Sequence, residues 1–155
     1  RLERKNIVEA VDASLKRLQC DYIDLYQLHW PERDSNYFGQ RNYYHAPDKD
    51  GVAIAETMNV LANIIKTGKI RYIGVCNETA WGVSEYLRLA GAALGPRIVS
   101  IQNPYSLLNR SFEIGLAEFA HREQLGLLAY SPLGFGCLSG KYREYQPMSS
   151  GVGGW

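Results

Sequence analysis

The stretch GKIRYIGVCN, residues 68–77, decides the fold because it joins a glycine, a short apolar segment and two polar residues. Gly68 stands where helices commonly end in a left-handed residue. Residues 70–75 are rich in side chains that suit a pleated surface, so they predict a strand. Upstream, apolar side chains recur at helical spacing, which predicts a helix before the glycine: Ile54, Met58, Leu61 and Ile65. The stretch therefore completes one helix–strand unit.

The same unit recurs on both sides of this stretch. Before it, Asn6 and Glu9 resemble a capping box that opens a helix through about Gln19, and a strand follows over residues 22–28. After it, we predict a helix at 79–93, a strand at 98–101, a helix at 111–124 capped by Gly126, and a strand at 127–130. Strands that alternate strictly with helices predict a parallel sheet with right-handed crossovers, and therefore an α/β fold.

Periodicity alone does not choose between an open doubly wound sheet and a closed barrel. The dinucleotide fingerprint of the open sheet is GxGxxG between a strand and a helix, and the chain does not contain it. Gly134, Gly136 and Gly140 lie in GFGCLSG, which does not fit that pattern. The missing fingerprint favours the barrel.

The composition is that of an ordinary globular domain. The chain has 155 residues, of which 46% are hydrophobic and 21% are charged, so one domain is the default expectation. Its 17 basic and 16 acidic residues are mixed along the chain, which argues against nucleic acid or an anionic membrane as partner. No apolar run approaches the roughly 18 residues of a membrane span, so membrane insertion is not expected.

Three cysteines, Cys20, Cys76 and Cys137, are far apart and lack any CxxC or Cys/His spacing. This pattern predicts neither a zinc site nor a disulfide framework, and we expect no metal. A reducing, cytoplasmic setting is the modest inference.

Residues 32–51 are polar, aromatic and rich in turn-forming residues, which predicts a long loop. Loops of about twenty residues are uncommon unless they are functional. Two readings stay open for the aromatic side chains of this loop, which could line a substrate pocket or cover the helix beneath: Tyr37, Phe38, Tyr43 and Tyr44.

The candidate chemistry follows the predicted strands, because ligands of parallel α/β folds bind at the carboxyl ends of strands. These ends offer His29, Cys76 with Asn77, Gln102 with Asn103, and Tyr130 with Ser131. Asn77 and Gln102 each present an amide donor and a carbonyl acceptor, which complement a primary carboxamide such as that of nicotinamide. Tyr130 could supply a flat face to the same ring.

Each of these residues also has a purely structural reading. His29 could be a hydrogen-bonding residue at a strand end, and Asn77 could cap the next helix. Tyr130 could be plain packing, and Gln102 could satisfy backbone groups. Lys141 could reach a phosphate, helped by flexible glycines, or it could be a solvated surface lysine.

Four segments carry a resemblance to a known family: YIDLYQLHWP at 22–31, GKIRYIGV at 68–75, IQNPYSLLNR at 101–110 and AYSPL at 129–133. On these segments the chain resembles the aldo/keto reductases over nearly its full length. The run from Gln102 to Arg110 and the loop after Trp30 are most similar to the bacterial Tas-like branch. That branch is also similar to the β subunits of voltage-gated potassium channels.

The resemblance implies part of a (β/α)8 TIM barrel, about four consecutive strand–helix units, and NADPH-dependent reduction of aldehydes or ketones by hydride transfer. It implies that His29 orients a small carbonyl substrate, that Asn77 and Gln102 hold the carboxamide, and that Tyr130 stacks on nicotinamide. The pyrophosphate is then bound by Ser131, Pro132, Leu133, Gly134 and Lys141. Cys76 stands where many relatives have serine, and a thiol is a weaker hydrogen-bonding group, so a looser cofactor contact is expected.

The resemblance also implies that residues 1–155 form a partial NADP-dependent oxidoreductase domain. The chain starts at Arg1 without an initiator Met and ends in the glycine-rich residues 149–155, so an internal fragment is expected. The family's catalytic Asp, Tyr and Lys are expected before Arg1, and the loop that reads the 2′-phosphate after Trp155. Alone, the chain is expected to be inactive and to self-associate through open sheet edges. The alternative function is a cofactor-binding regulatory subunit of the channel β-subunit type.

Overall fold

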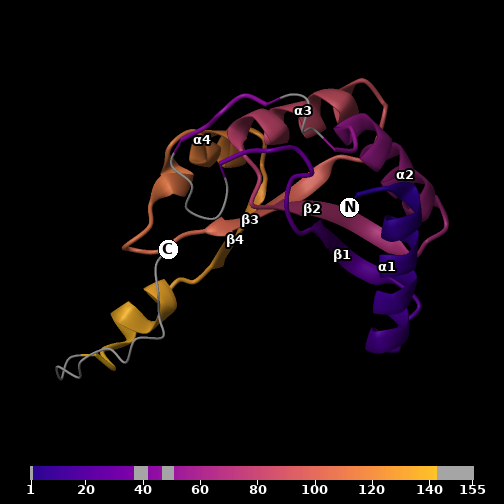
Figure 1. The fold of residues 1–155 in the computed structure, drawn as a ribbon. Helices are drawn as coiled ribbons and strands as arrows, with labels where there is room; N and C mark the ends of the chain where they lie inside the picture. The colour runs from indigo at the N-terminus through magenta and orange to yellow at the C-terminus, as the bar shows by residue number, and fades with distance from the viewer. Residues whose placement is uncertain (1, 37–41, 47–50, 143–155) are drawn as a thin grey trace.

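The computed structural model describes residues 2–36, 42–46 and 51–142 (Figure 1). The described part contains one four-stranded sheet in the order β1-β2-β3-β4, and every neighbouring pair is parallel. Its strands are β1 (Ile23–Leu28), β2 (Ile70–Cys76), β3 (Ile98–Pro104) and β4 (Gly126–Tyr130). The parallel sheet predicted from the alternation of strands and helices is confirmed.

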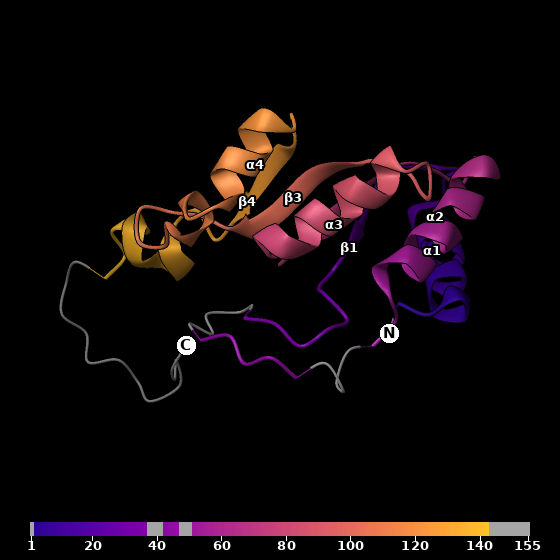
Figure 2. The ribbon, with the colours of Figure 1, turned by 90° about the horizontal axis from the view of Figure 1, so that it is seen from above.

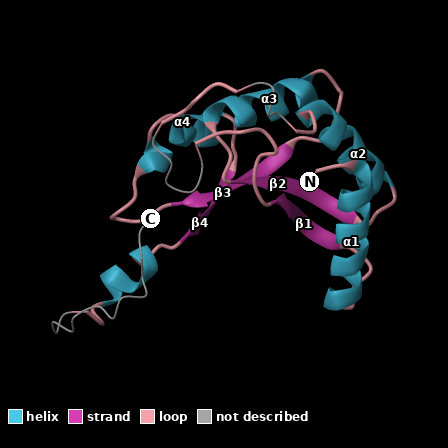
Figure 3. Cartoon of the chain, viewed as in Figure 1, coloured by secondary structure: helices cyan, strands magenta, loops and turns pink. Residues whose placement is uncertain are grey.

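Helices alternate with the strands along the chain and cover one face of the sheet. They are α1 (Arg4–Leu18), α2 (Ile54–Lys66), α3 (Ala80–Gly91) and α4 (Leu116–Arg122), with 3-10 turns η2 (Ser111–Glu113) and η3 (Gly134–Ser139). Figures 1 and 3 show the α-helices as an arc around the outside of the curved sheet. Four parallel strands with alternating helices on the outer face fit part of a (β/α)8 barrel, as predicted.

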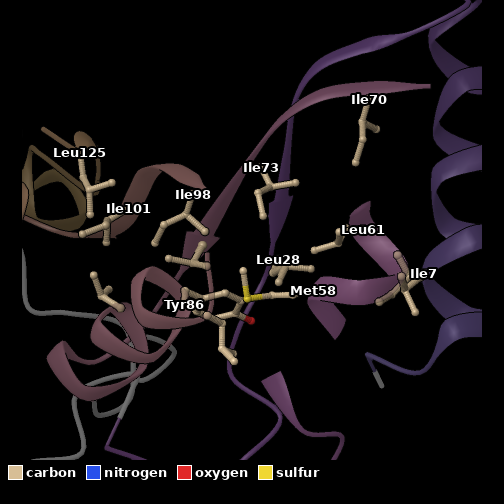
Figure 4. Packing of buried hydrophobic residues seen from close by; sticks show 14 of the residues in the cluster. Ile7, Leu28, Met58, Leu61, Ile70, Ile73, Tyr86, Ile98, Ile101 and Leu125 are labelled. Atoms are coloured by element: carbon tan, nitrogen blue, oxygen red, sulfur yellow. The ribbon is translucent and has the colours of Figure 1, made fainter. Parts of the chain in front are cut away.

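The core lies between the sheet and this arc of helices. Met58 and Leu61 of α2 are fully buried, as are Ile73 of β2 and Ile101 of β3. Figure 4 shows these side chains as part of a continuous layer between the strands and the helices. A leucine or isoleucine buried in this way contributes roughly 1.5–3 kcal/mol, so the helical face of the sheet is held chiefly by apolar burial.

The opposite face of the sheet carries small and polar groups near its middle. In the strand register Gly74 lies between Gln27 of β1 and Ser100 of β3. A side chain added at Gly74 would collide with the Ser100 hydroxyl and the Gln27 amide. Glycine is therefore required there by the close approach of its neighbours rather than by its backbone conformation.

Of two predicted helix ends, one is confirmed and one is wrong. Gly68 has a φ of 78°, which confirms it as the left-handed residue after α2. The capping box at Asn6 is wrong, because α1 already begins at Arg4 and the Ile7 N–H donates to the Glu3 carbonyl. Asn6 therefore lies inside the first turn, where its side chain cannot cap the helix.

The helix predicted at 111–124 is shorter than expected. Gly115 has a φ of 92°, so it separates η2 from the seven-residue α4. Gly126 is not the cap: it begins β4, and Gln124 is the left-handed residue, with a φ of 53°. The turn comes early because Leu125 is buried and its N–H donates to the Ala120 carbonyl, which fixes the residue before it.

The segment after β1 contains no helix or strand in its described parts, 31–36, 42–46 and 51–53, as predicted. Figure 2 shows these parts lying outside the layers of helices and strands. Tyr43 and Tyr44 are exposed, and the Tyr43 hydroxyl lies 2.8 Å from His45 Nδ1. Tyr37, Phe38 and the glycine-rich residues 149–155 lie outside the described residues.

Candidate functional site

Asn77 stands at the centre of a group of residues from all four strand ends. Its backbone N–H donates to the Gln102 carbonyl at 2.9 Å, and its Nδ2 donates to the His29 carbonyl at 2.9 Å. The Tyr130 hydroxyl donates to Asn77 Oδ1 at 2.7 Å. The structure therefore brings His29, Asn77, Gln102 and Tyr130 together as one connected group, here called the strand-end group.

The backbone of Asn77 is left-handed, with a φ of 56°, and its side chain is buried. Asparagine tolerates this conformation better than most residues with a side chain. The reading of Asn77 as a helix cap is wrong, because Thr79 occupies the N-cap of α3 and its hydroxyl accepts from the Gly82 N–H at 3.3 Å. The Asn77 amide instead joins β1 to β4.

Cys76 lies beside Asn77 and is buried. Its Sγ accepts from Asn77 Nδ2 at 3.2 Å. Burial raises the pKa of the Cys76 thiol, and a hydrogen bond from the Asn77 backbone partly offsets that rise. A thiol with a raised pKa stays protonated at neutral pH, so Cys76 is a weak acceptor for Asn77 and not a nucleophile.

Gln102 is held by a residue that the sequence analysis did not select. Its Oε1 accepts from Gln27 Nε2 at 2.6 Å, and among the described residues its own Nε2 has no hydrogen-bond partner. Gln27 lies on β1, two residues before His29, and alternation continued past the strand end would put both side chains on one face. That alternation could have identified Gln27. Its Oε1 and the hydroxyl of Ser100 are buried without a partner in the described structure.

Tyr130 is partly buried at the end of β4. Burial raises its pKa, and the neighbouring Cys76 contributes in the same direction. The phenol therefore remains protonated at neutral pH and can donate to Asn77. The plain packing reading is incomplete, because the hydroxyl has a specific partner.

The ring of His29 is exposed and stacks on Trp30, with centroids 4.2 Å apart and planes 28° from parallel. Asn77 Nδ2 donates to the backbone carbonyl of His29 and not to its ring. The ring nitrogens of His29 have no hydrogen-bond partner in the described part of the chain. The imidazole can therefore contact a ligand while the backbone of the same residue holds Asn77.

Residues 131–134 continue directly from β4 as a tight turn. Ser131 has a φ of 53° and its carbonyl accepts from the Gly134 N–H at 2.9 Å. Pro132 and Leu133 are exposed. Lys141 lies beyond the far end of η3, and its Nζ stands 4.8 Å from the centroid of the Tyr142 ring. The turn therefore adjoins the strand-end group, whereas Lys141 is separated from it by η3.

A buried ion pair next to the strand-end group was also missed. Arg33 donates to both carboxylate oxygens of Glu78, at 2.9 and 2.6 Å. Asn103 Nδ2 donates to the Glu78 backbone carbonyl at 3.1 Å. The available signal was a charged residue two positions after the end of β2, because a charged residue in a buried position is usually paired.

A cavity of about 260 Å³ lies on the helical side of this ion pair. Its lining includes Arg33, Glu78, Trp81 and Tyr86, and no member of the strand-end group. Burial, assisted by the nearby Glu78 charge, raises the pKa of Tyr86. The cavity and the strand-end group are therefore separate features.

The model of the family described as "Aldo/keto reductase family" matches residues 1–152. The chain belongs to the aldo/keto reductase family. The predicted family is thus confirmed, and the relationship explains why the polar residues gather at the strand ends of a barrel-like sheet.

Sequence identity to individual proteins supports this assignment. The chain is 60% identical to "Protein tas" of Escherichia coli over 91% of its own length and 41% of that protein. It is 40% identical to an "Aldo-keto reductase" of Babesia bovis, over 97% and 57%, respectively. It is 35% identical to the "NADH-specific methylglyoxal reductase" of Escherichia coli, over 94% and 39%. The chain therefore spans between about two fifths and three fifths of these relatives.

Aldo/keto reductases generally use nicotinamide cofactors, and the strand-end group fits a nicotinamide carboxamide. Gln102 Nε2 is a donor without a partner among the described residues, and Asn77 Oδ1 has a second lone pair beside the one that Tyr130 occupies. The donor and the acceptor lie on neighbouring strands. A primary carboxamide needs one donor for its oxygen and one acceptor for its amino group, and these two side chains supply one of each.

Other kinds of site lack support in the described chain. Its residues contain no group of three or more His, Cys, Asp or Glu side chains that could hold a metal ion. Among its helices, none has the length and apolar character needed to cross a membrane.

Proposed function

We propose that residues 1–155 form the nicotinamide-facing part of an NADPH-dependent aldo/keto reductase that reduces aldehydes or ketones. The hydrogen bonds that Asn77 makes to His29, Gln102 and Tyr130 carry this proposal. They join His29, which we propose contacts the substrate, to the three residues that we propose contact the cofactor. Such joint positioning is what hydride transfer between two bound molecules requires.

The residues of the strand-end group have separate roles in this proposal. Gln102 donates to the carboxamide oxygen, Asn77 accepts from the carboxamide nitrogen, and the ring of Tyr130 supports the nicotinamide face. When bound, the reduced cofactor supplies a hydride to the carbonyl carbon of the substrate. The protein's contribution is orientation, since a fixed carboxamide sets the angle at which the nicotinamide meets the substrate.

His29 is the proposed contact for the carbonyl substrate. Its ring is exposed and held flat against Trp30, so its orientation is restricted although its nitrogens remain available. A neutral imidazole can donate one hydrogen bond to a carbonyl oxygen. His29 would therefore place the substrate next to the nicotinamide held by Asn77 and Gln102.

The turn after β4 is the proposed pyrophosphate contact. Its members are Ser131, Pro132, Leu133 and Gly134, and Lys141 would add a positive charge from beyond η3. NADPH is proposed over NADH from the family resemblance. One relative is named as NADH-specific, so NADH is the second cofactor to be tested.

The activity is proposed for the intact protein, since the chain spans 41% of the length of tas. Residues 1–155 would then be part of one oxidoreductase domain. Cys20, Cys76 and Cys137 are all free thiols, which supports a reducing, cytoplasmic setting.

The test is turnover by the intact protein with NADPH or NADH as reductant and methylglyoxal or p-nitrobenzaldehyde as carbonyl substrate. We expect oxidation of the cofactor, followed by its near-ultraviolet absorbance, with NADPH preferred. Gln102→Met removes the amide but retains the length of the side chain, and it should raise the KM for NADPH about tenfold. Cofactor binding without turnover would favour the regulatory-subunit alternative, and no binding would overturn both.

A further inference from the structure

The Arg33–Glu78 ion pair joins two segments that the proposed activity must hold together. Arg33 comes from the segment after β1, four residues beyond His29, and Glu78 directly follows Asn77. The pair is bidentate, and Arg33 Nη2 also donates to the Thr79 hydroxyl at 3.1 Å. The guanidinium lies 4.8 Å from the centroid of the Trp81 ring.

Both members of this pair are taken out of water, with side-chain exposures of 14% for Arg33 and 3% for Glu78. Desolvation of two charges offsets much of their attraction, so a buried pair is weak support for stability by itself. A bidentate guanidinium does, however, fix the direction of the carboxylate that it binds. The geometry is therefore better explained by positioning than by net stabilisation.

Glu78 is held at both its carboxylate and its backbone carbonyl. Its carboxylate accepts from Arg33 and from the Thr79 N–H at 2.9 Å, and its carbonyl accepts from Asn103 Nδ2. Asn77, one residue earlier, has the left-handed backbone that most side chains disfavour. A fixed neighbour on one side is what keeps a residue in such a conformation.

We infer that the Arg33–Glu78 pair is a positioning device that holds Asn77 in its left-handed conformation and keeps it in register with His29. This inference rests on the proposed function, because it assigns the pair to the orientation of the cofactor amide. Arg33 and Glu78 are positioning residues that touch neither substrate nor cofactor. Without the pair, the Asn77 amide loses its direction although the strands remain paired.

Helix α3 has a glycine at the position where it packs against the ion pair. A side chain at Gly82, in the first turn of α3, would collide with the Glu78 carboxylate and approach Arg33 Nη2. A side chain at Gly91, the last residue of the same helix, would meet nothing within 4 Å. Gly82→Ala and Gly91→Ala therefore form a matched pair, and only the first disturbs the proposed device.

The experiment compares five forms of the intact protein: the parent, Arg33→Met, Arg33→Met with Glu78→Gln, Gly82→Ala and Gly91→Ala. Cofactor fluorescence gives the Kd for NADPH, steady-state kinetics give KM for NADPH and p-nitrobenzaldehyde, and thermal unfolding gives Tm. A loss of folded protein lowers kcat alone, whereas a misdirected Asn77 raises the KM for the cofactor. The two effects are therefore separable.

We expect Arg33→Met and Gly82→Ala to raise the Kd and KM for NADPH about tenfold and to change the aldehyde KM by less than about twofold. Gly91→Ala should match the parent. The double variant removes both charges, so its Tm should rise above that of Arg33→Met while its Kd for NADPH stays high.

Two results would overturn this inference but leave the proposed function standing. One is a parent-like Kd for NADPH in both Arg33→Met and Gly82→Ala. The other is recovery of both Tm and Kd in the double variant, which would make the pair purely structural. A parent that binds neither NADPH nor NADH would instead overturn the proposed function, and this inference with it.

Discussion

Asn77 combines an unfavourable backbone with a side chain that is hydrogen-bonded at both its oxygen and its nitrogen. Its φ is 56°, while Nδ2 donates to the His29 carbonyl and Oδ1 accepts from Tyr130. A left-handed residue costs on the order of 1 kcal/mol unless its surroundings support it, and asparagine is among the residues that tolerate it. The side-chain hydrogen bonds, together with the adjacent Glu78 pair, offset that cost. Backbone strain and the orientation of the amide are thus linked at one residue.

Tyr130→Phe tests this link at a single hydroxyl. The ring remains, so stacking on a planar ligand is retained, whereas Asn77 Oδ1 loses its donor. A net hydrogen bond is worth about 0.5–1.5 kcal/mol, so we expect the Kd for NADPH to rise between about twofold and tenfold. Fluorescence titration of the intact protein measures this change.

The control for this variant is Tyr72→Phe on β2. The Tyr72 side chain is exposed and its hydroxyl has no hydrogen-bond partner in the described part of the chain. Its removal should leave the Kd for NADPH unchanged. Equal effects of the two variants would show that the Tyr130 hydroxyl does not direct the Asn77 amide.

At the scale of elements, the units were predictable because each leaves a local signal. Apolar spacing identified α2 and β2, and Gly68 marked the end of the helix between them. The start of α1 was misplaced because a capping box at Asn6 is only a local pattern, and helical bonding begins at Glu3. The break in the predicted helix at Gly115 was missed because the sequence pattern does not indicate whether a glycine has a positive or a negative φ.

In the candidate site, too, some residues were predictable from the sequence and others were not. Strand order placed His29, Asn77, Gln102 and Tyr130 at the carboxyl end of the sheet, since each lies at or near the carboxyl end of a parallel strand. The partners Gln27 and Arg33 were missed because they contact residues 75 and 45 positions away. Contacts over such separations leave no periodic signal in one sequence. They follow only from the way the chain folds in three dimensions.

Leu61→Ala tests how much of the sheet depends on α2. Leu61 is fully buried within the core cluster, so truncation removes transfer free energy and leaves a cavity. We expect the free energy of unfolding to fall by about 2–5 kcal/mol, as measured by urea denaturation of the intact protein. Leu18→Ala at the end of α1 is the matched control, because Leu18 is 63% exposed. It should change stability by less than about 0.5 kcal/mol, and an equal loss in both would contradict the assignment of the core.

At the scale of the whole molecule, the described sheet has two edges. Among the described strands, β1 pairs only with β2, and β4 pairs only with β3. A complete (β/α)8 barrel removes such edges by closing the sheet on itself. Leu128 on the edge strand β4 is also exposed, as is Tyr72 on the inner strand β2. Open edges beside exposed apolar side chains are a template for pairing with another chain.

We therefore expect the isolated 155-residue chain to self-associate and to lack aldehyde turnover. Native mass spectrometry over a range of concentrations, with and without NADPH, measures the assembly state and bound cofactor together. Leu128→Lys places a charge on the β4 edge strand and should shift the population toward monomer, because a charged edge disfavours pairing. A compact monomer at every concentration would contradict association through the edges. A dimer that carries NADPH would show that two copies restore a binding face that one sheet of four strands leaves open.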